Sequence, residues 1–395
     1  MRDVSHKALL PAGLRDLLPP EAAHEAEAVR RLLACFMAQG YEQVKPPLVE
    51  FEEALLSGTG AALRAQTFRL MDPVSQRMMG LRADMTPQVV RLANSRLLNA
   101  PRPLRLCYAG PVLQIRGSQL RPEREFTQVG LELIDAPPVT GDTEAILLGA
   151  GALQAIGVTG LSVDLNLPPL ITALAEALGF AEAEARRLRH ALDGKDAAAV
   201  ESIAGDKADP FLALLRAAGP APDAIAALQG LQLPEAAAAG LESLRRVVAA
   251  IGREMPELTL TLDPVEHRGF EYQTGISFIF FARGVRGELG RGGRYESGGA
   301  DAAAESCSGF SLFMDSILRA LPPPAPRRRL FLPADCDGAR AAALREDGWV
   351  TLRALTDAAD PAAEARRLGC SHLLSEAQVV ALSGDDKIAP EDTEK

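Results

Sequence analysis

The chain has 395 residues, 47% of them hydrophobic and 5% aromatic, and its formal net charge is −10. A chain of this length can bury one large core and one or two smaller ones. The negative charge disfavours a nucleic-acid-binding protein, which gathers phosphate groups through long-range attraction. Because no apolar run approaches the roughly 20 residues of a membrane span, and the first residues lack the apolar core of a secretion signal, we expect a cytoplasmic protein without membrane contact.

The cysteines give no sign of a metal site or of a disulfide framework. They form no CxxC pair, and no histidine lies at the spacing typical of a zinc site. We therefore expect reduced thiols and neither disulfides nor a metal. The five positions are Cys35, Cys107, Cys307, Cys336 and Cys370.

The first third of the chain predicts one helix followed mainly by strands. Apolar residues recur at helical spacing after Pro19 and Pro20, and Gly40 marks the end of a helix of about 20 residues. Four apolar runs of strand length then follow, interrupted by a helix over about 86–98. Strands joined by tight polar loops predict an α+β fold, an antiparallel sheet flanked by helices. The four runs are residues 68–71, 78–83, 103–115 and 126–134.

The middle of the chain predicts a helical insertion. Residues 141–157 form an amphipathic pattern, and a short strand follows at 161–167. Residues 168–255 are rich in Ala, Leu and Arg, and Gly and Pro separate runs of helix length. Strand character returns over 258–262 and 275–284. Residues 308–321 predict a helix that closes the sheet, so we expect a core domain over 1–325.

The last part of the chain predicts a small α/β domain over 326–383, after the proline-rich segment 322–326. Strand-like runs at 330–335, 349–355 and 372–382 alternate with helical stretches. This β-α-β-α-β order predicts some parallel pairing. Residues 384–395 are polar, and we expect them to form a tail.

The string LRADMTPQVVR, residues 81–91, places an acid and a hydroxyl close together at the end of a predicted strand. An ammonium group removed from water needs an anion and hydrogen-bond acceptors, which Asp84 and Thr86 can supply. Asp84 can equally cap the helix that follows, and one residue can do both.

Gln128 and Glu132 lie four residues apart in TQVGLELI, so they share one face of the predicted strand, with Gly130 between them. Two polar side chains on a buried face are costly unless a partner satisfies them. They either contact a ligand or form a buried polar pair satisfied within the protein.

These segments resemble those of histidyl-tRNA synthetases, which are class II aminoacyl-tRNA synthetases. Residues 106–134 resemble the second class II motif, and residues 81–91, 267–280 (HRGFEYQTGISFIF) and 290–299 (GRGGRYESGG) resemble the strings that form the histidine pocket. On its own, 290–299 is typical of a glycine-rich turn between strands. The residues that carry the motif-2 resemblance are Tyr108, Gly110, Pro111, Phe126, Gln128, Gly130 and Glu132.

The resemblance implies a class II fold that forms dimers and a pocket for histidine. It assigns Asp84 and Thr86 to the amine and Arg268 to the carboxylate, whose two oxygens suit a guanidinium fork. It assigns further polar contacts to Gln128 and Glu132. Tyr272 belongs to the aromatic wall, but Gln273 stands where synthetases have a second tyrosine. The floor candidates are Gly292, Gly293, Arg294 and Tyr295.

The segments that would bind ATP depart from the synthetases. The second motif carries Arg and Glu after its Gly-Pro pair, where this chain has Gln114 and Arg116. In the third motif, GFSLFMDSI at 309–317, Phe313 replaces a glycine, Asp315 a glutamate and Ser316 the arginine. Adenylyl transfer needs preorganised positive charge around the phosphates. Arg121 and Arg124 are nearby but lie in the loop, so we expect no amino-acid activation and no catalytic residue.

This combination resembles the regulatory subunits of ATP phosphoribosyltransferase, which act in histidine biosynthesis. Asp-Met-Thr-Pro-Gln at 84–88 is close to that family's sequence, and the small last domain resembles a truncated anticodon-binding domain. The resemblance implies a non-catalytic subunit without a cofactor, which associates with a short-form catalytic subunit and with itself. It also implies feedback by histidine and no tRNA binding.

Three questions stay open from the sequence. Histidine could bind in the synthetase-like pocket or at an interface with the catalytic subunit. A divergent histidyl-tRNA synthetase, activating histidine with ATP, is the alternative function. A tRNA-binding module without activation is a third, which the acidic composition disfavours.

Overall fold

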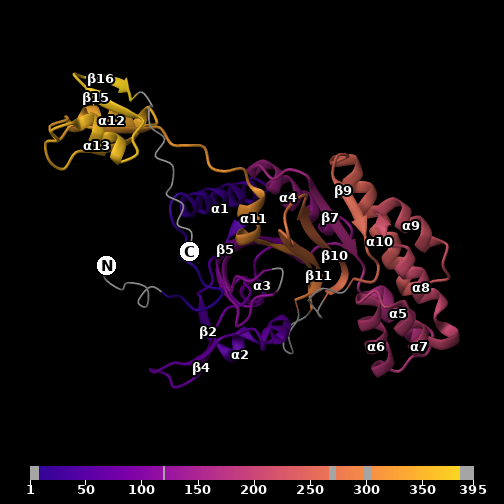
Figure 1. Cartoon of the computed structure of the whole chain (residues 1–395). Coiled ribbons are helices and arrows are strands. Elements are labelled where there is room, and N and C mark those ends of the chain that lie inside the picture. Colours follow the sequence, from indigo (N-terminus) through magenta and orange to yellow (C-terminus); the bar gives the residue numbers. More distant parts are fainter. Residues whose placement is uncertain (1–8, 119–120, 267–272, 298–303, 383–395) are drawn as a thin grey trace. The chain divides into compact units, whose positions relative to one another are not determined.

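The structure is a computed structural model of the whole chain, and it describes residues 9–118, 121–266, 273–297 and 304–382 (Figure 1). Contacts divide the chain into two compact units, Met1–Pro322 and Pro323–Lys395. The first contains a large sheet flanked by helices and the second a small α/β arrangement. The α+β class predicted from the sequence is confirmed.

Among the described residues, the large sheet has nine strands. Its central strands, from β5 to β7, pair antiparallel, whereas β1 pairs parallel to β5 and β9 parallel to β7. In spatial order the strands are β1 (Glu42–Gln43), β5 (Leu104–Leu113), β6 (Glu125–Ile134), β12 (Ser306–Phe313), β11 (Gly290–Glu296), β10 (Gln273–Ala282), β7 (Leu161–Asn166), β9 (Thr259–Leu262) and β8 (Gly219–Pro220).

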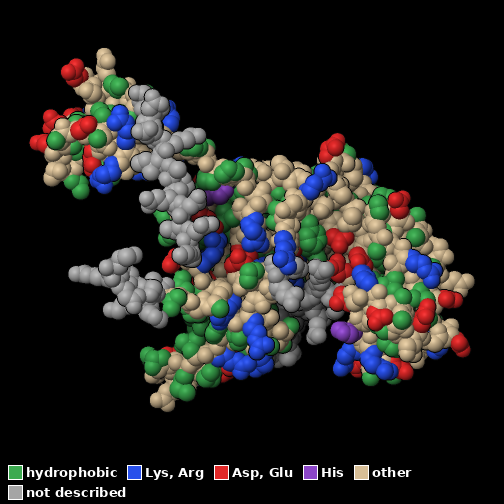
Figure 2. Space-filling model, in the orientation of Figure 1, with side chains coloured by type: hydrophobic (Ala, Val, Ile, Leu, Met, Phe, Trp, Pro, Cys, Tyr) green, Lys and Arg blue, Asp and Glu red, His purple; other side chains and the backbone are tan. Residues whose placement is uncertain are grey.

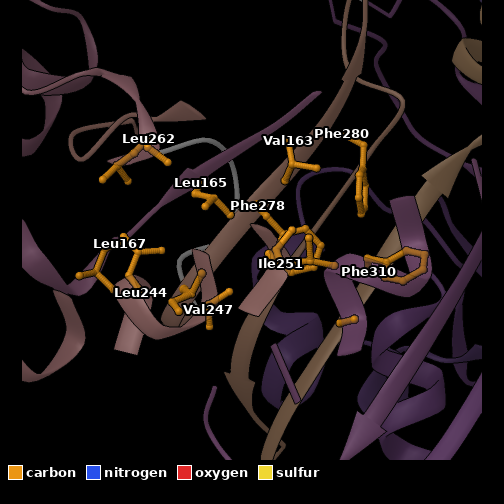
Figure 3. Packing of buried hydrophobic residues seen from close by; sticks show 14 of the residues in the cluster. Val163, Leu165, Leu167, Leu244, Val247, Ile251, Leu262, Phe278, Phe280 and Phe310 are labelled. Carbon is orange, nitrogen blue, oxygen red and sulfur yellow. The ribbon is translucent and has the colours of Figure 1, made fainter. Parts of the chain in front are cut away.

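Helices α1 (Glu21–Ala38) and α4 (Thr140–Ile156) cover one face of this sheet. Helix α1 follows Pro20 and buries residues at helical spacing, including Leu32 and Phe36. The ring of Phe36 meets Phe310 of β12 edge-on, with centroids 5.6 Å apart. Each fully buried side chain of this kind contributes roughly 1.5–3 kcal/mol to the free energy of unfolding. Because the largest cluster of buried hydrophobic residues lies on this face, it is the main core. Figure 3 shows part of that core, in which Phe280 meets Phe278 and Phe310 edge-on. Helix α10 (Glu235–Glu254) contributes Leu244, Val247 and Ile251 to the same cluster.

The opposite face carries helix α3 (Thr86–Ala93) and a second core. Side chains alternate along β5, so Cys107 packs in the first core while Leu106 and Tyr108 pack in the second. A small antiparallel sheet with α2 (Glu52–Leu55) and the 3-10 helix η2 (Gly58–Leu63) lies beside α3. Its strands are β2 (Val49–Phe51), β4 (Met78–Leu81) and β3 (Arg69–Met71).

The predicted helical insertion is confirmed between β7 and β9. Glycine and proline separate its helices as the sequence indicates, and the two-residue strand β8 joins it to β9. Charged side chains of both signs are interspersed over these helices on the face shown in Figure 2, with ion pairs such as Arg186–Glu182. Besides α10, its helices are α5 (Pro169–Ala177), α6 (Glu182–Asp193), α7 (Ala197–Ala204), η3 (Gly205–Lys207), α8 (Asp209–Arg216) and α9 (Ala221–Gln229).

The second unit has a four-stranded sheet among its described residues, in the order β14, β13, β15, β16. Strand β13 pairs parallel to both β14 and β15, as the alternating pattern predicts. The run at 372–382 is a hairpin, not one strand, because Glu376 and Ala377 adopt positive φ and turn the chain. The elements are β13 (Arg329–Leu332), α12 (Gly338–Glu346), β14 (Val350–Arg353), α13 (Pro361–Arg367), β15 (His372–Ser375) and β16 (Gln378–Ala381).

The helix predicted over 308–321 is wrong in its first half. Residues Ser306–Phe313 are strand β12, and only Met314–Ala320 form a helix, α11. Strand β12 pairs with β6 on one side and β11 on the other, and nearly all its residues are buried. A strand buried on both faces lacks polar alternation, so an apolar run does not distinguish it from a helix.

Candidate functional site

A small cavity lies on the face of the large sheet that carries α3, over the centres of β6, β12 and β11. Its volume of ≈ 30 Å³ is about that of one water molecule. It is bounded by side chains of both charges and by glycine backbone. The lining residues are Asp84, Thr86, Glu132, Gln273, Arg291, Gly292, Gly293, Tyr295, Gly309, Phe310 and Ser311.

Two glycines make room for the polar side chains around this cavity. In the strand register Gly309 pairs with Glu132, and Gly130 pairs with both Tyr108 and Ser311. A Cβ at Gly309 would overlap the carboxylate of Glu132, and one at Gly130 would lie 2.5 Å from the hydroxyl of Tyr108. Glycine is therefore required at both positions, because polar side chains occupy the volume above the strands.

Glu132 is the centre of the site and is only 1% exposed. Its Oε2 accepts a hydrogen bond from Tyr295 at 2.7 Å, and its Oε1 accepts from Tyr108 and Thr86, both at 3.0 Å. Burial raises the pKa of Glu132 to about 8, although these hydrogen bonds oppose the shift, and the charge of Asp84 adds to it. The carboxyl group is therefore satisfied but retains a proton easily.

Asp84 and Gln128 form a second buried pair. Oδ1 of Asp84 accepts from the Thr86 amide at 2.8 Å and from Nε2 of Gln128 at 2.9 Å. Oε1 of Gln128 accepts from the Met85 amide at 2.9 Å. Asp84 thus bonds the first N–H of α3, as the helix-cap interpretation expects, and also faces the cavity.

Five lining residues were not found from the sequence as pocket residues: Gln273, Arg291, Gly309, Phe310 and Ser311. Ser311 accepts from Gln128 and lies 3.1 Å from the hydroxyl of Tyr108, so it connects the two buried groups. Recognising 306–313 as a strand next to β6 would have placed Ser311 and Gly309 there. Gln273 stood out only as a departure from the family, and its Nε2 donates to the Gly292 carbonyl at 3.3 Å.

The structure brings most of the predicted residues together. Asp84, Thr86, Glu132 and Tyr295 line the cavity, and Gln128 is buried beside it. Arg268 and Tyr272 lie outside the described residues. No ligand contact is part of this geometry, so the assignment of these side chains to histidine stays a prediction.

Arg294 is not part of the pocket floor, and that prediction is wrong. Residues 290–296 are strand β11, not a turn, so Arg294 faces away from its neighbours Gly293 and Tyr295. Its Nη2 lies 3.0 Å from Oδ1 of Asp142, and its Nη1 donates to the Ala136 carbonyl at 2.8 Å. This buried pair ties the start of α4 to the sheet.

The positions that would hold nucleotide phosphates carry other groups. Gln114 donates to the Ala83 carbonyl at 3.4 Å, and Arg116 is exposed. Phe313 is 7% exposed, and its ring packs edge-on against Phe126 with centroids 5.6 Å apart. The guanidinium group of Arg121 lies over Phe313, 3.7 Å from the ring centroid. This region is therefore filled by the chain's own side chains.

The charge of Arg121 is compensated within the protein. Its Nη2 donates to Oε1 of Glu288 at 2.7 Å, and its Nε lies 3.6 Å from Oδ2 of Asp315. Burial lowers the pKa of Arg121 and raises that of Asp315. Arg124 donates to the carbonyls of Gln114 and Ala12. Both loop arginines thus have structural partners.

All five cysteines are free thiols. Burial raises the pKa of Cys107 to about 11 and that of Cys307 to about 12. The part of the chain that the structure describes contains no group of three or more His, Cys, Asp or Glu able to hold a metal ion. Across the same residues, no helix combines the length and apolar character needed to cross a membrane.

Comparison with known proteins first defines the class. Residues 13–317 match the family model described as histidyl-tRNA synthetase. A Bacillus halodurans protein described as an ATP phosphoribosyltransferase regulatory subunit/histidyl-tRNA synthetase has a TM-score of 0.79 and 24% identity, over 91% of this chain and 96% of that one. The histidyl-tRNA synthetase of a Nostoc species has a TM-score of 0.77 and 17% identity, over 93% and 90%. The fold is that of the class II, histidyl-tRNA synthetase-like proteins.

Closer relatives identify the family. The ATP phosphoribosyltransferase regulatory subunit of Rhodospirillum centenum is 55% identical over 366 residues, which cover 93% of this chain and 94% of the relative. That of Paramagnetospirillum magneticum is 54% identical over 374 residues, covering 95% and 98%. The chain belongs to the family of ATP phosphoribosyltransferase regulatory subunits, and the resemblance stated from its sequence is confirmed.

Proposed function

We propose that this chain is a non-catalytic subunit of the cytoplasm that docks onto a short-form catalytic subunit of ATP phosphoribosyltransferase. There it is required for the first step of histidine biosynthesis and allows histidine to inhibit that step. One observation carries the proposal: the groups suited to an amino acid remain around a small cavity, while Phe313 and Arg121 fill the neighbouring region.

The polar groups of the cavity fit a zwitterionic ligand with an imidazole ring. Asp84 supplies a carboxylate for the ammonium group, and its orientation is fixed by the bonds from Thr86 and Gln128. Glu132 can accept from or donate to an imidazole nitrogen, since its raised pKa lies near neutrality. The family resemblance assigns Arg268 to the carboxylate, Tyr272 to the aromatic wall and Tyr295 to the floor.

Binding must widen the cavity, because ≈ 30 Å³ is smaller than an amino acid. Gln273 and Arg291 are the half-buried polar side chains of its lining. Moving them exchanges hydrogen bonds without unpacking the core. A ligand that binds only the widened state shifts the population toward that state by its differential affinity. Histidine can inhibit the assembly only if that state is coupled to the catalytic subunit.

Absence of catalysis follows from the charges around Phe313. Adenylyl transfer needs cations directed at the phosphates as the transition state forms. Glu288 and Asp315 already neutralise Arg121, and Ser316 stands where synthetases have an arginine. We therefore propose that the chain does not activate amino acids. The family resemblance supports two further proposals: the chain binds no tRNA, and it associates with itself through the class II core.

The test is reconstitution of the full-length chain with a short-form catalytic subunit. Turnover of ATP and phosphoribosyl pyrophosphate should depend on this chain, and added histidine should lower it. Turnover of the catalytic subunit that is the same with and without this chain would remove the proposal. The chain carrying Glu132→Ala provides the matched control, since it should support turnover that histidine no longer inhibits.

A further inference from the structure

Strand β11 directs Arg291, Gly293 and Tyr295 to the cavity face, because side chains alternate along a strand. At one end, Tyr295 donates to Oε2 of Glu132 at 2.7 Å. In the middle, a Cβ at Gly293 would lie 2.8 Å from Nε2 of Gln273, so only glycine leaves the floor open. At the other end, Arg291 brings a guanidinium group to the wall. The cavity therefore has carboxyl groups on its β6 and α3 side and a guanidinium group on its β11 side.

The charges along this line complement an α-amino acid. The described lining residues include two carboxyl groups, on Asp84 and Glu132, and one guanidinium group, on Arg291. A carboxylate suits an ammonium group, and a guanidinium fork suits a carboxylate. A ligand whose ammonium group lies at Asp84 thus has a counter-charge for its own carboxylate at Arg291.

Arg291 can change partner without leaving a buried charge alone. Oε1 of Glu288 accepts from Nη2 of Arg291 and also from Nη2 of Arg121, the latter at 2.7 Å. The side chains of Arg291 and Glu288 are 25% and 15% exposed. If a ligand carboxylate binds Arg291, Glu288 still accepts a hydrogen bond from Arg121. Glu288 is then not left as an isolated buried ion, which would be costly.

We infer that Arg291 is a specificity-determining residue that supplies a second guanidinium group for the carboxylate of the amino-acid ligand, in addition to Arg268, which the family resemblance assigns to it, and that Arg291 gives up its bond to Glu288 in exchange. The inference rests on the proposed function, because it assigns part of the same pocket. It predicts that the pocket distinguishes an amino acid from its alcohol, because a carboxylate can replace Glu288 as a charged partner of the guanidinium group and a hydroxymethyl group cannot.

The experiment is calorimetry on the complex with the short-form catalytic subunit, using two probes. L-histidine has the carboxylate, and L-histidinol has a hydroxymethyl group in its place. Arg291→Gln should lower the affinity for L-histidine by about 10- to 100-fold, since a hydrogen bond to a charged group is lost. The affinity for L-histidinol should change by less than about twofold. Arg291→Lys keeps the positive charge but not the forked guanidinium geometry. It should lower the affinity for L-histidine alone, and by a smaller factor than Arg291→Gln does.

Arg319→Gln is the matched control. Arg319 belongs to the same charged region, with Nη2 3.0 Å from Oγ of Ser316, but it does not line the cavity. It should leave both affinities unchanged. If Arg291→Gln lowers the affinities for L-histidine and L-histidinol equally, or leaves that for L-histidine unchanged, the inference about Arg291 is wrong, although the proposed pocket is not contradicted. Failure of the wild-type complex to bind L-histidine overturns the proposed pocket and this inference together.

Discussion

The guanidinium group of Arg121 covers the ring of Phe313, with Cζ 3.7 Å from the ring centroid. Phe126 meets the same ring edge-on, and Glu288 and Asp315 lie beside the guanidinium group. A cation over an aromatic face is attracted to it, more strongly where water is excluded. Aromatic surface and charge that could contact a nucleotide are thus used for contacts inside the protein.

Phe313→Ala is predicted to destabilise the chain without producing catalysis. The ring is 7% exposed, and removing a buried phenylalanine costs about 3–5 kcal/mol of the free energy of unfolding. ATP–pyrophosphate exchange with histidine should stay at background, because Gln114 and Ser316 supply no cation to the opened space. Urea unfolding and an exchange assay measure the two effects.

The wild-type chain is the control for this assay and should also give no exchange. Histidine-dependent exchange above background in the wild type would contradict a non-catalytic role and favour a divergent synthetase. Exchange that arises only in Phe313→Ala would show that the ring itself blocks an otherwise competent site.

Much of the fold could be predicted from the sequence because the patterns are local. Helix α1 has apolar residues at helical spacing between clear start and stop residues, and β5 and β6 are apolar runs of strand length. Strand β12 could not be identified in this way, since it is buried on both faces and its apolar run continues into α11. The missing information is pairing with β6 and β11, which is not local.

The candidate site shows the same limit. Gln128 and Glu132 could be placed on one face by their spacing within a strand. Arg294 was misplaced, because the glycine-rich string around it did not indicate a strand, and strand alternation sends it to the opposite face. Ser311 and Arg291 reach the cavity only through the order of strands in the sheet.

Arg294→Leu tests this reassignment. Removing one partner of a buried ion pair leaves Asp142 without its counter-ion, although Ser308 and the Val139 amide still donate to it, and should cost about 3 kcal/mol of the free energy of unfolding. The affinity of the folded fraction for histidine should be unchanged, because the side chain lies on the other face of the sheet. Urea unfolding and calorimetry provide the two measurements. A selective loss of histidine affinity with normal stability would return Arg294 to the pocket.

Gly309→Ala is predicted to damage the site, because its Cβ would overlap the carboxylate of Glu132 and the Leu131 carbonyl. The thermal midpoint should fall and histidine binding should be lost. Gly252→Ala in α10 is the matched control, since nothing lies within 4 Å of a Cβ there. Alanine is favoured over glycine in a helix by about 1 kcal/mol, so the control should be neutral or stabilising. Equal thermal midpoints for the two variants would refute the steric argument.

Histidine affinity tests the assignment of Glu132 and Arg268 to the pocket. Glu132→Ala and Arg268→Ala should each weaken the binding of histidine by about 10-fold or more, because each removes a hydrogen-bonding partner of a charged or polar group of the ligand. Glu296→Ala serves as the control, since Glu296 is exposed at the end of β11. Calorimetry on the complex with the catalytic subunit measures all three. Unchanged affinity in both pocket variants would place the effector elsewhere, such as the subunit interface.

Glu132 should make the stability of the chain depend on pH. Its pKa is about 8 in the folded protein against an ordinary value of 4.5, so the folded state holds a proton that the unfolded state loses as pH rises. The contribution of Glu132 is therefore fully present below about pH 4.5 and is lost progressively up to about pH 8. In that window the free energy of unfolding should fall by up to about 1.4 kcal/mol per pH unit through this group.

Glu132→Gln isolates the effect, because glutamine does not titrate while every other group is unchanged. Urea unfolding at several pH values between about 5 and 8 should show the wild type losing stability relative to the variant as pH increases. A constant difference between the two proteins across this range would mean that Glu132 ionises at its ordinary pKa. The three hydrogen bonds from Tyr295, Tyr108 and Thr86 would then offset the cost of burying its charge.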